Sequence, residues 1–196
     1  RTVDSDRRLS QPFTSPASGM IATALIQLYK MATNAPDASE WIPDVRVAGD
    51  IRPAEGALGG LHAALVHAGS DIVLVAWDMP FVPASLLREL RARGERDGAD
   101  ARADARADAV LPESDGSRRG VEPLCAWYSA RCLPAVERAL DSGDRRVVAF
   151  HAQIVTQRMS IEEVRSYGDP AQLFGNVNTP EDLALAERQL AAGGRS

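Results

Sequence analysis

The sequence predicts an α/β fold built on a doubly wound, mostly parallel sheet. Three observations support this prediction. The chain has 196 residues, the length of one domain with a sizeable core,. Segments typical of strands and of helices alternate along it. Residues 72–77 form a β-branched-rich run without polar alternation, which is typical of a strand that is covered on both faces in a parallel sheet.

Composition and charge set the domain organisation and exclude several classes of partner. Residues 1–19 carry charges, prolines and hydroxyl side chains with little apolar surface, so we expect a loose arm there and a single domain over residues 20–196. The longest apolar run has six residues, against about 20 in a membrane-spanning helix, so we expect no membrane segment. The chain carries a net charge of −5 and therefore lacks the positive field that attracts nucleic acids.

The cysteines and histidines indicate a cytoplasmic protein without a metal centre built from these residues. Cys125 and Cys132 are seven residues apart in a segment that we expect to be partly helical, where about 10 Å would separate them. That distance is too long for a disulfide, so we interpret both as reduced thiols. His62, His67 and His151 lack metal-ligand spacing, which favours structural or surface roles.

The first half of the chain alternates between helical and strand-like patterns. Apolar residues from Met20 to Leu28 recur at helical spacing,. The next segments contain turn-forming residues, a short β-branched run and glycines before a helical pattern,. We therefore expect a helix over residues 20–28, a turn over 34–37, a strand over 45–48, a helix over 59–68 and a strand over 72–77.

The second half continues this alternation. Pro83 opens a helical pattern, and the charge-rich residues 94–109 form a solvated connector or an extension of that helix,. Thr179 and Pro180 have the features of a helix start, with acids in the first turn,. We expect helices over residues 86–93, 135–140 and 183–190, and strands over 109–111, 124–128 and 147–150,.

Asp78 is the leading candidate for chemistry because it directly follows the predicted buried strand. In open α/β sheets, ligands bind beyond the carboxyl ends of the strands. Pro80 restricts the backbone there and gives the carboxylate a stiff support,. One or two carboxylates together with substrate phosphates are enough to hold Mg²⁺. The alternative interpretation is an ordinary turn or capping aspartate.

Two further motifs fit a nucleotide site. Gly56-Ala57-Leu58-Gly59-Gly60 joins a predicted strand to a helix, where glycines allow close backbone approach and free N–H groups attract an anion. The same glycines also suit a plain connecting turn. Asn176 and Asn178 alternate before the last helix and suit ribose hydroxyls, a base edge or the support of a metal, or simply a turn and cap.

These motifs together resemble a known family. The sequence contains Asp78-Met79-Pro80-Phe81, the glycines of residues 56–60, Glu122-Pro123-Leu124-Cys125-Ala126-Trp127-Tyr128 and Phe174-Gly175-Asn176-Val177-Asn178-Thr179-Pro180-Glu181-Asp182. Their order is similar to that in the molybdenum cofactor guanylyltransferases, over about residues 32–190. The resemblance implies a Rossmann-like, three-layer nucleotidyltransferase fold. It also implies transfer of GMP from GTP to the phosphate of molybdenum-bound molybdopterin, with release of pyrophosphate.

The resemblance assigns roles to residues of this chain by their position in the motifs. Asp78 matches the catalytic aspartate that binds Mg²⁺ and the nucleotide. The remaining matches are nucleotide-binding Gly56 and Gly60, guanine-binding Asn34, nucleotide-contacting Asp50, and the paired Asn176 and Asn178 near the active centre. The implied partners are GTP and molybdopterin, together with contacts to a molybdoenzyme or a cofactor-biosynthesis protein.

The sequence departs from the family pattern at its start. The family opens with a loop of the form Leu-Ala-Gly-Gly-x-Ser-x-Arg-Met-Gly, followed by a lysine, and no such loop is recognisable before Asn34. Two alternatives therefore stay open: cytidylyl transfer to the same cofactor, and a non-catalytic carrier of a nucleotide or cofactor. The basic pairs Arg118-Arg119 and Arg145-Arg146 suit bidentate contact with the pterin phosphate or, more simply, solvated loops.

Overall fold

The computed structural model describes residues 22–26, 28–32, 46–100 and 106–193. Internal contacts divide the chain into a larger unit, Ser18–Asn176, and a smaller one that includes Val177–Ser196. The predicted arm over residues 1–19 lies outside the described residues, and the single domain over residues 20–196 stays a prediction. In the described ranges, no helix is long and apolar enough to cross a membrane.

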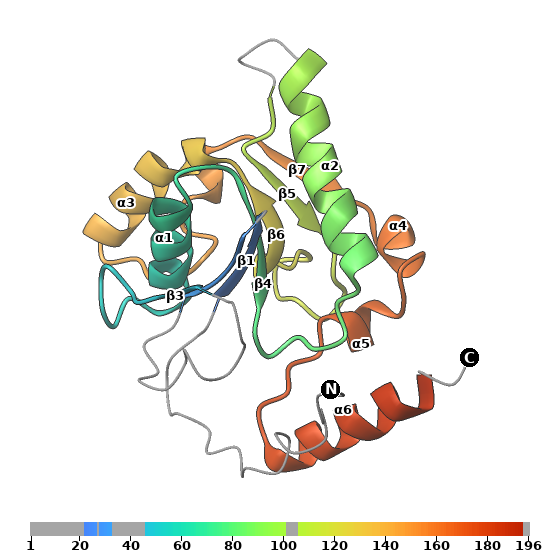
Figure 1. The fold of residues 1–196 in the computed structure, drawn as a ribbon. Coiled ribbons are helices and arrows are strands. Elements are labelled where there is room, and N and C mark those ends of the chain that lie inside the picture. The colour runs from blue at the N-terminus through green and yellow to red at the C-terminus, as the bar shows by residue number, and fades with distance from the viewer. Residues whose placement is uncertain (1–21, 27, 33–45, 101–105, 194–196) are drawn as a thin grey trace, which may run out of the picture. The chain divides into compact units, whose positions relative to one another are not determined.

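The larger unit combines a seven-stranded sheet with helices (Figure 1). Its strands are β1 Ala22–Ile26, β2 Leu28–Ala32, β3 Arg46–Ala48, β4 Ile72–Ala76, β5 Ala109–Pro112, β6 Cys125–Tyr128 and β7 Thr156–Met159. Its helices are α1 Gly56–Ala68, α2 Ala84–Asp100, α3 Leu133–Asp141, α4 Ile161–Arg165 and α5 Pro170–Leu173. Short 3₁₀ helices span Ala130–Cys132 and His151–Gln153.

The strand order is β3-β2-β1-β4-β6-β5-β7. The pairs β2–β3 and β5–β7 are parallel, whereas β1–β2, β1–β4, β4–β6 and β5–β6 are antiparallel. Following these pairs across the sheet shows that β2, β3, β4, β5 and β7 run in one direction and that β1 and β6 run in the other. The mostly parallel α/β sheet predicted from the sequence is confirmed, with one reversed strand on each side of β4.

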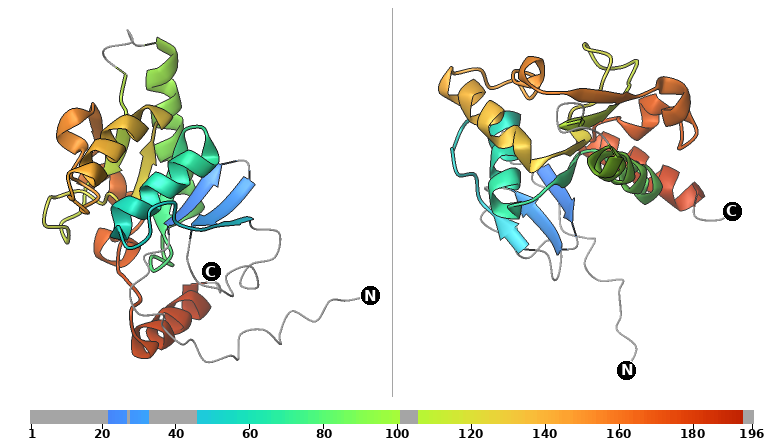
Figure 2. Two further views of the ribbon diagram at one scale, coloured as in Figure 1. Left: turned by 90° about the vertical axis from the view of Figure 1, so that its left-hand side faces the viewer. Right: turned by 90° about the horizontal axis from the view of Figure 1, so that it is seen from above.

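One face of the sheet is covered by α1 and α3. Leu58 and Leu61 of α1 and Val136 of α3 are fully buried against Ile72 and Leu74 of β4. Figure 2 shows these two helices together on one side of the strands when the molecule is viewed from above. This layer forms the larger of two hydrophobic clusters.

The opposite face is covered by α2, α4 and α5 (Figure 2). Leu86 and Leu90 of α2 are fully buried there against Val73 of β4 and Trp127 of β6. Because successive side chains of β4 point to opposite faces, both layers require apolar residues from this strand. The unbroken apolar run at residues 72–76 is thereby explained, and the three-layer architecture is confirmed.

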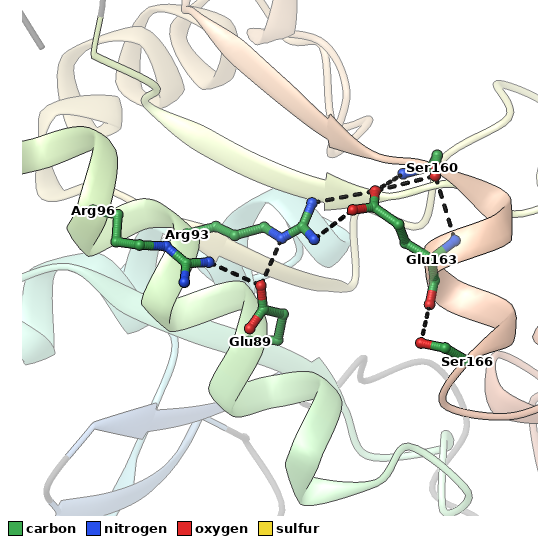
Figure 3. A network of polar contacts seen from close by, with 6 residues as sticks. All are labelled: Glu89, Arg93, Arg96, Ser160, Glu163 and Ser166. Atoms are coloured by element: carbon green, nitrogen blue, oxygen red, sulfur yellow. Dashed lines mark hydrogen bonds and ion pairs between the residues drawn. The ribbon is translucent and has the colours of Figure 1, made fainter.

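A polar network joins α2 to α4 on this second face (Figure 3). Arg93 donates to Glu163 at 2.7 Å and to Glu89 at 3.0 Å. Glu163 also completes a capping box at the start of α4, where the hydroxyl of Ser160 accepts from the Glu163 N–H and the Glu163 carboxylate accepts from the Ser160 N–H. The Arg93 guanidinium lowers the pKa of Glu163 to about 2, because it stabilises the charged form.

Two sequence predictions of secondary structure are wrong. Residues 22–26 and 28–32 form the antiparallel pair β1–β2 in place of the helix predicted over residues 20–28. Residues 147–150 form turns in place of a strand, with the Ala149 N–H donating to the Arg146 carbonyl at 2.9 Å. Phe150 is nevertheless fully buried in the core, which accounts for the apolar character of this segment.

The other predicted elements within the described residues are present. The helix predicted over residues 59–68 already begins at Gly56, and the helix predicted over residues 86–93 extends to Asp100. Strand β7 and the short helices α4 and α5 have no counterpart among the predictions. The turn predicted over residues 34–37 lies outside the described residues.

The smaller unit contains α6, Pro180–Gly193. The Thr179 hydroxyl accepts from the Asp182 N–H at 3.1 Å, and the Asp182 carboxylate accepts from the Thr179 N–H at 3.0 Å. This reciprocal pair satisfies backbone donors at the helix start. The predicted N-terminus of the last helix, with Pro180 in its first position, is confirmed.

Candidate active site at the carboxyl edge of the sheet

The direction of the strands brings several predicted residues to one edge of the sheet. The carboxyl ends of parallel strands meet at the same edge, so Asp50 after β3 and Asp78 after β4 belong to it. Strand β6 runs in reverse, so its amino end, preceded by Glu122, lies at this edge too. The edge therefore combines carboxylates that follow strands with one that precedes a strand.

Asp78 occupies the position predicted for it. Strand β4 ends at Ala76, and the Met79 N–H donates to the Ala76 carbonyl at 3.2 Å, closing a turn that contains Asp78. The side chain is half-buried, and burial raises the pKa of the carboxyl group. Met79 is buried and Pro80 follows it. The buried side chain of Met79 and the restricted backbone of Pro80 hold the turn in place.

Glu122 belongs to the segment that leads into β6, the antiparallel neighbour of β4. The register pairs Ile72 with Tyr128 and Val75 with Cys125, so partner numbers sum to 200. The Ala76 N–H extends this pairing by donating to the Leu124 carbonyl at 2.7 Å. Beyond this bond both chains leave the strand pairing in turns, in which the Met79 N–H donates to the Ala76 carbonyl at 3.2 Å and the Cys125 N–H donates to the Glu122 carbonyl at 3.3 Å.

The environment of Glu122 is that of an oriented, half-buried carboxylate. Its Oε1 accepts a hydrogen bond from the Leu124 N–H at 3.2 Å. Burial raises the pKa of its carboxyl group, and the neighbouring charge of Asp78 raises it further. Both effects disfavour ionisation, because the charge is taken out of water and meets a like charge. Sequence reasoning missed Glu122 because it precedes a strand, and its approach to Asp78 depends on a long-range antiparallel pairing.

The donor set at this edge fits Mg²⁺. Within the described ranges, no arginine, lysine or histidine forms an ion pair with Asp78 or Glu122, and no group of three or more His, Cys, Asp or Glu side chains is gathered as a complete metal cage. Mg²⁺ is characteristically bound by one or two carboxylates together with phosphate oxygens of a substrate. Asp78 and Glu122, two carboxylates without an ion-pair partner among the described residues, match that requirement.

The glycine motif is the first turn of α1. Gly56 is exposed with φ of 61°, a left-handed conformation that favours glycine,. At Gly59 an added Cβ would lie 2.8 Å from Cβ of Glu55, so this turn tolerates no side chain. Gly60 is buried within the helix. Contact of Gly56 and Gly60 with a nucleotide stays a prediction.

The remaining predicted site residues are distributed differently. Asp50 is half-buried in the segment after β3, and Asn34 lies outside the described residues. Asn176 is exposed and is the last residue of the larger unit, whereas Asn178 belongs to the smaller unit. The roles that the family resemblance gave to these residues stay predictions.

The arginine pairs are exposed, as their polar surroundings indicated. Arg145 donates to Glu55 at 2.8 Å, directly before α1, and Arg146 pairs with Asp144. Arg118 and Arg119 lie in the turn between β5 and β6. These placements match the solvated-loop interpretation.

The cysteines and histidines have structural positions. Cys125 and Cys132 are buried free thiols, as predicted, and burial raises the pKa of Cys132 to about 12. His62 is buried 3.7 Å from Glu137, between α1 and α3. His151 packs edge-on against Phe150, with ring centroids 4.9 Å apart.

The chain is similar to known proteins in sequence and in fold. The family model described as the MobA-like NTP transferase domain matches residues 20–155. The molybdenum cofactor guanylyltransferase of Desulfosudis oleivorans is 32% identical over 148 residues, which cover 75% of this chain and 67% of that protein. The probable molybdenum cofactor guanylyltransferase of Pelotomaculum thermopropionicum is 32% identical over 153 residues, covering 78% and 68%.

A solved structure shows the same fold. The molybdopterin-guanine dinucleotide biosynthesis protein A of Archaeoglobus fulgidus superposes with a TM-score of 0.66 at 28% identity, over 82% of this chain and 77% of that one. The family model, the sequence relatives and the solved structure each match most of this chain. The chain belongs to the family of MobA-like NTP transferase domains.

Proposed function

We propose that this protein transfers GMP from GTP to the phosphate of molybdenum-bound molybdopterin and releases pyrophosphate. The observation that carries the proposal is Asp78, a half-buried carboxylate on a stiff turn at the carboxyl end of β4. That is the edge at which ligands of open α/β sheets bind. The names of the relatives, molybdenum cofactor guanylyltransferases, supply the substrates.

The chemistry requires positioning more than covalent help. An oxygen of the molybdopterin phosphate attacks the α-phosphorus of GTP, the new P–O bond forms, and the bond to the β-phosphate breaks with departure of pyrophosphate. When bound, Mg²⁺ neutralises charge on the triphosphate and on the leaving group. Asp78 supplies a carboxylate ligand for the ion, and the anchored turn fixes that ligand before the substrate arrives.

The two alternatives have less support. The relatives are named for guanylyl transfer, which favours GTP over CTP. A carrier without turnover does not require an uncompensated carboxylate pair at the ligand edge, whereas a metal-dependent transferase does. We also propose a cytoplasmic location, because both cysteines are free thiols,. Contacts with a molybdoenzyme or a biosynthesis protein stay a prediction.

The test measures pyrophosphate released by the full chain with GTP, Mg²⁺ and molybdenum-loaded molybdopterin, and with CTP in a parallel reaction. We expect release with GTP and its loss in Asp78→Asn, which removes the charge and keeps the shape. Asp115→Asn is the matched control, since Asp115 is exposed and pairs only with Arg165 in the described structure. Equal turnover of Asp78→Asn and wild type, or no release with GTP, would refute the proposal.

A further inference from the structure

We propose that Trp77 is a stacking platform for the fused ring system of a substrate, next to the carboxylate of Asp78. Guanine and the pterin share this ring chemistry, since each contains an aminopyrimidinone ring fused to a second planar ring. The inference rests on the proposed function for the class of substrate. It goes beyond that function by assigning a ring-binding residue to the site.

Trp77 and Asp78 are the two central residues of one β-turn. The Met79 N–H donates to the Ala76 carbonyl at 3.2 Å, and a bond between the fourth and the first residue closes a turn of this kind. The side chains of the two central residues branch from the tip of the turn, away from that bond. Adjacent Cα atoms are about 3.8 Å apart. An indole and a carboxylate thus project from neighbouring positions directly after β4.

Both ends of this turn are fixed in the sheet and the core. Ala76 is the last residue of β4, it pairs with Ala22 of β1, and its N–H donates to the Leu124 carbonyl at 2.7 Å. Ala76 and Met79, the first and last residues of the turn, are both buried. A turn that is anchored at both ends restricts its central residues before a ligand arrives, which lowers the entropic cost of binding.

Trp77 differs from the buried residues around it in its exposure. It is 39% exposed, and the other exposed large apolar residues in the described ranges are aliphatic: Ile51, Val66, Val155 and Leu185. Trp127, on the neighbouring strand β6, is 3% exposed and belongs to the core. Trp77 therefore offers an aromatic side chain that the core does not enclose, at the edge where ligands of open α/β sheets bind. Flat heterocycles stack on aromatic side chains in such positions.

The two side chains of the turn suit the two ends of one substrate molecule. GTP and molybdopterin, the proposed substrates, each carry a phosphate and a fused planar ring. A ligand whose phosphate meets a cation at Asp78 brings its ring near the side chain of the adjacent residue. Stacking does not depend on the hydrogen-bonding edge of the ring. Trp77 therefore contributes affinity and the orientation of the ring plane, and other groups distinguish one base from another.

The test compares variants of Trp77 with wild type by isothermal titration calorimetry of the full chain in the presence of Mg²⁺. The probes are GTP and hydroxymethylpterin, which carry the fused ring, and inorganic triphosphate, which does not. We expect Trp77→Ala to weaken binding of at least one ring-bearing probe about tenfold, a typical loss for one stacked base, and to leave the affinity for inorganic triphosphate unchanged.

Two further variants and a control separate stacking from packing. Trp77→Phe keeps an aromatic face and should retain most of the affinity for the ring. Trp77→Leu keeps apolar bulk without that face and should bind as weakly as Trp77→Ala. Val155→Ala changes an exposed apolar residue directly before β7 and should bind all three probes as wild type does.

The two ring-bearing probes identify the source of the ring. A loss of affinity for GTP alone assigns guanine to Trp77, and a loss for hydroxymethylpterin alone assigns the pterin. Unchanged affinity of Trp77→Ala and Trp77→Leu for both probes, or no binding of either probe by wild type, would overturn the inference. An equal loss of affinity for inorganic triphosphate would overturn it too, because that probe has no ring to stack.

The outcomes also separate this inference from the proposed function. Weakened ring binding in Trp77→Ala together with no pyrophosphate release by wild type would support the stacking role and refute the guanylyl transfer. Pyrophosphate release by wild type with unchanged ring binding in Trp77→Ala would do the reverse.

Discussion

The contact between helix α2 and Trp127 allows a worked prediction about stability. A Cβ added at Gly94 would lie 2.2 Å from Cδ2, 2.3 Å from Cε2 and 2.5 Å from Cε3 of the Trp127 ring. Ordinary carbon contacts begin near 3.5 Å, so the indole or the helix must move by about 1 Å. Trp127 is 3% exposed and is enclosed by the second hydrophobic cluster, which leaves it little room to move.

Two opposing free energies decide the outcome for Gly94→Ala. Alanine in a helix interior gains about 1 kcal/mol over glycine. Overpacking of a buried site costs about 1 to 3 kcal/mol, occasionally more. Because the clash involves several ring atoms, we expect the upper part of that range and a net loss of about 1 to 2 kcal/mol in the free energy of unfolding, measured by urea denaturation.

A second substitution tests the cause. In a Trp127→Leu background the clash is relieved, so Gly94→Ala should become neutral or stabilising, and a double-mutant cycle should give a coupling energy of about 1 kcal/mol or more. A Gly94→Ala protein as stable as wild type, or an alanine effect that is the same in both backgrounds, would refute the reasoning.

Three further predictions concern buried and paired groups. Glu163→Gln should lower the free energy of unfolding by about 0.5 to 1 kcal/mol at pH 7, since the pair with Arg93 is partly exposed,. Because the folded-state pKa of Glu163 lies below its usual value of 4.5, at about 2, the difference from wild type should shrink as the pH falls from 4.5 to 2 in denaturation curves. Tyr128→Phe should cost about 1 kcal/mol by the same measurement, because the partly buried Pro123 carbonyl loses its donor,; an unchanged midpoint would contradict this. Cys125 and Cys132 should resist alkylation at pH 8 in the native protein and react only after unfolding, because burial raises the pKa of both thiols,; rapid labelling of the native chain would show that they are accessible.

The sequence predicted the central elements well because their apolar patterns match their environments. Residues 72–76 are buried from both sides, and their pattern is unbroken. The segment at residues 20–28 has apolar residues that fit either a helix or a strand, and hydrogen bonds to β4 make β1 a strand. Strand β7 escaped prediction because its sequence, Thr-Gln-Arg-Met, has only one strongly apolar residue.

The candidate site was predictable only where function follows a local rule. Asp78 comes two residues after the end of β4, so its position at the ligand edge could be predicted from the order of residues. Glu122 reaches the same edge only because β6 is reversed, and the direction of a strand depends on pairing with distant residues. The position of the glycine motif at the start of α1 shows a similar limit, since the pattern predicted the helix to begin three residues later.

Strand β7 also has a consequence for how copies of this protein behave in concentrated solution. It is the last strand of the described sheet on its side, and it is polar, with Thr156 and Arg158 exposed. Open sheet margins invite strands from other molecules, and a positive charge with few apolar side chains discourages such stacking. The polar composition that made β7 difficult to predict from the sequence thus also protects the chain against fibril-like aggregation at that margin.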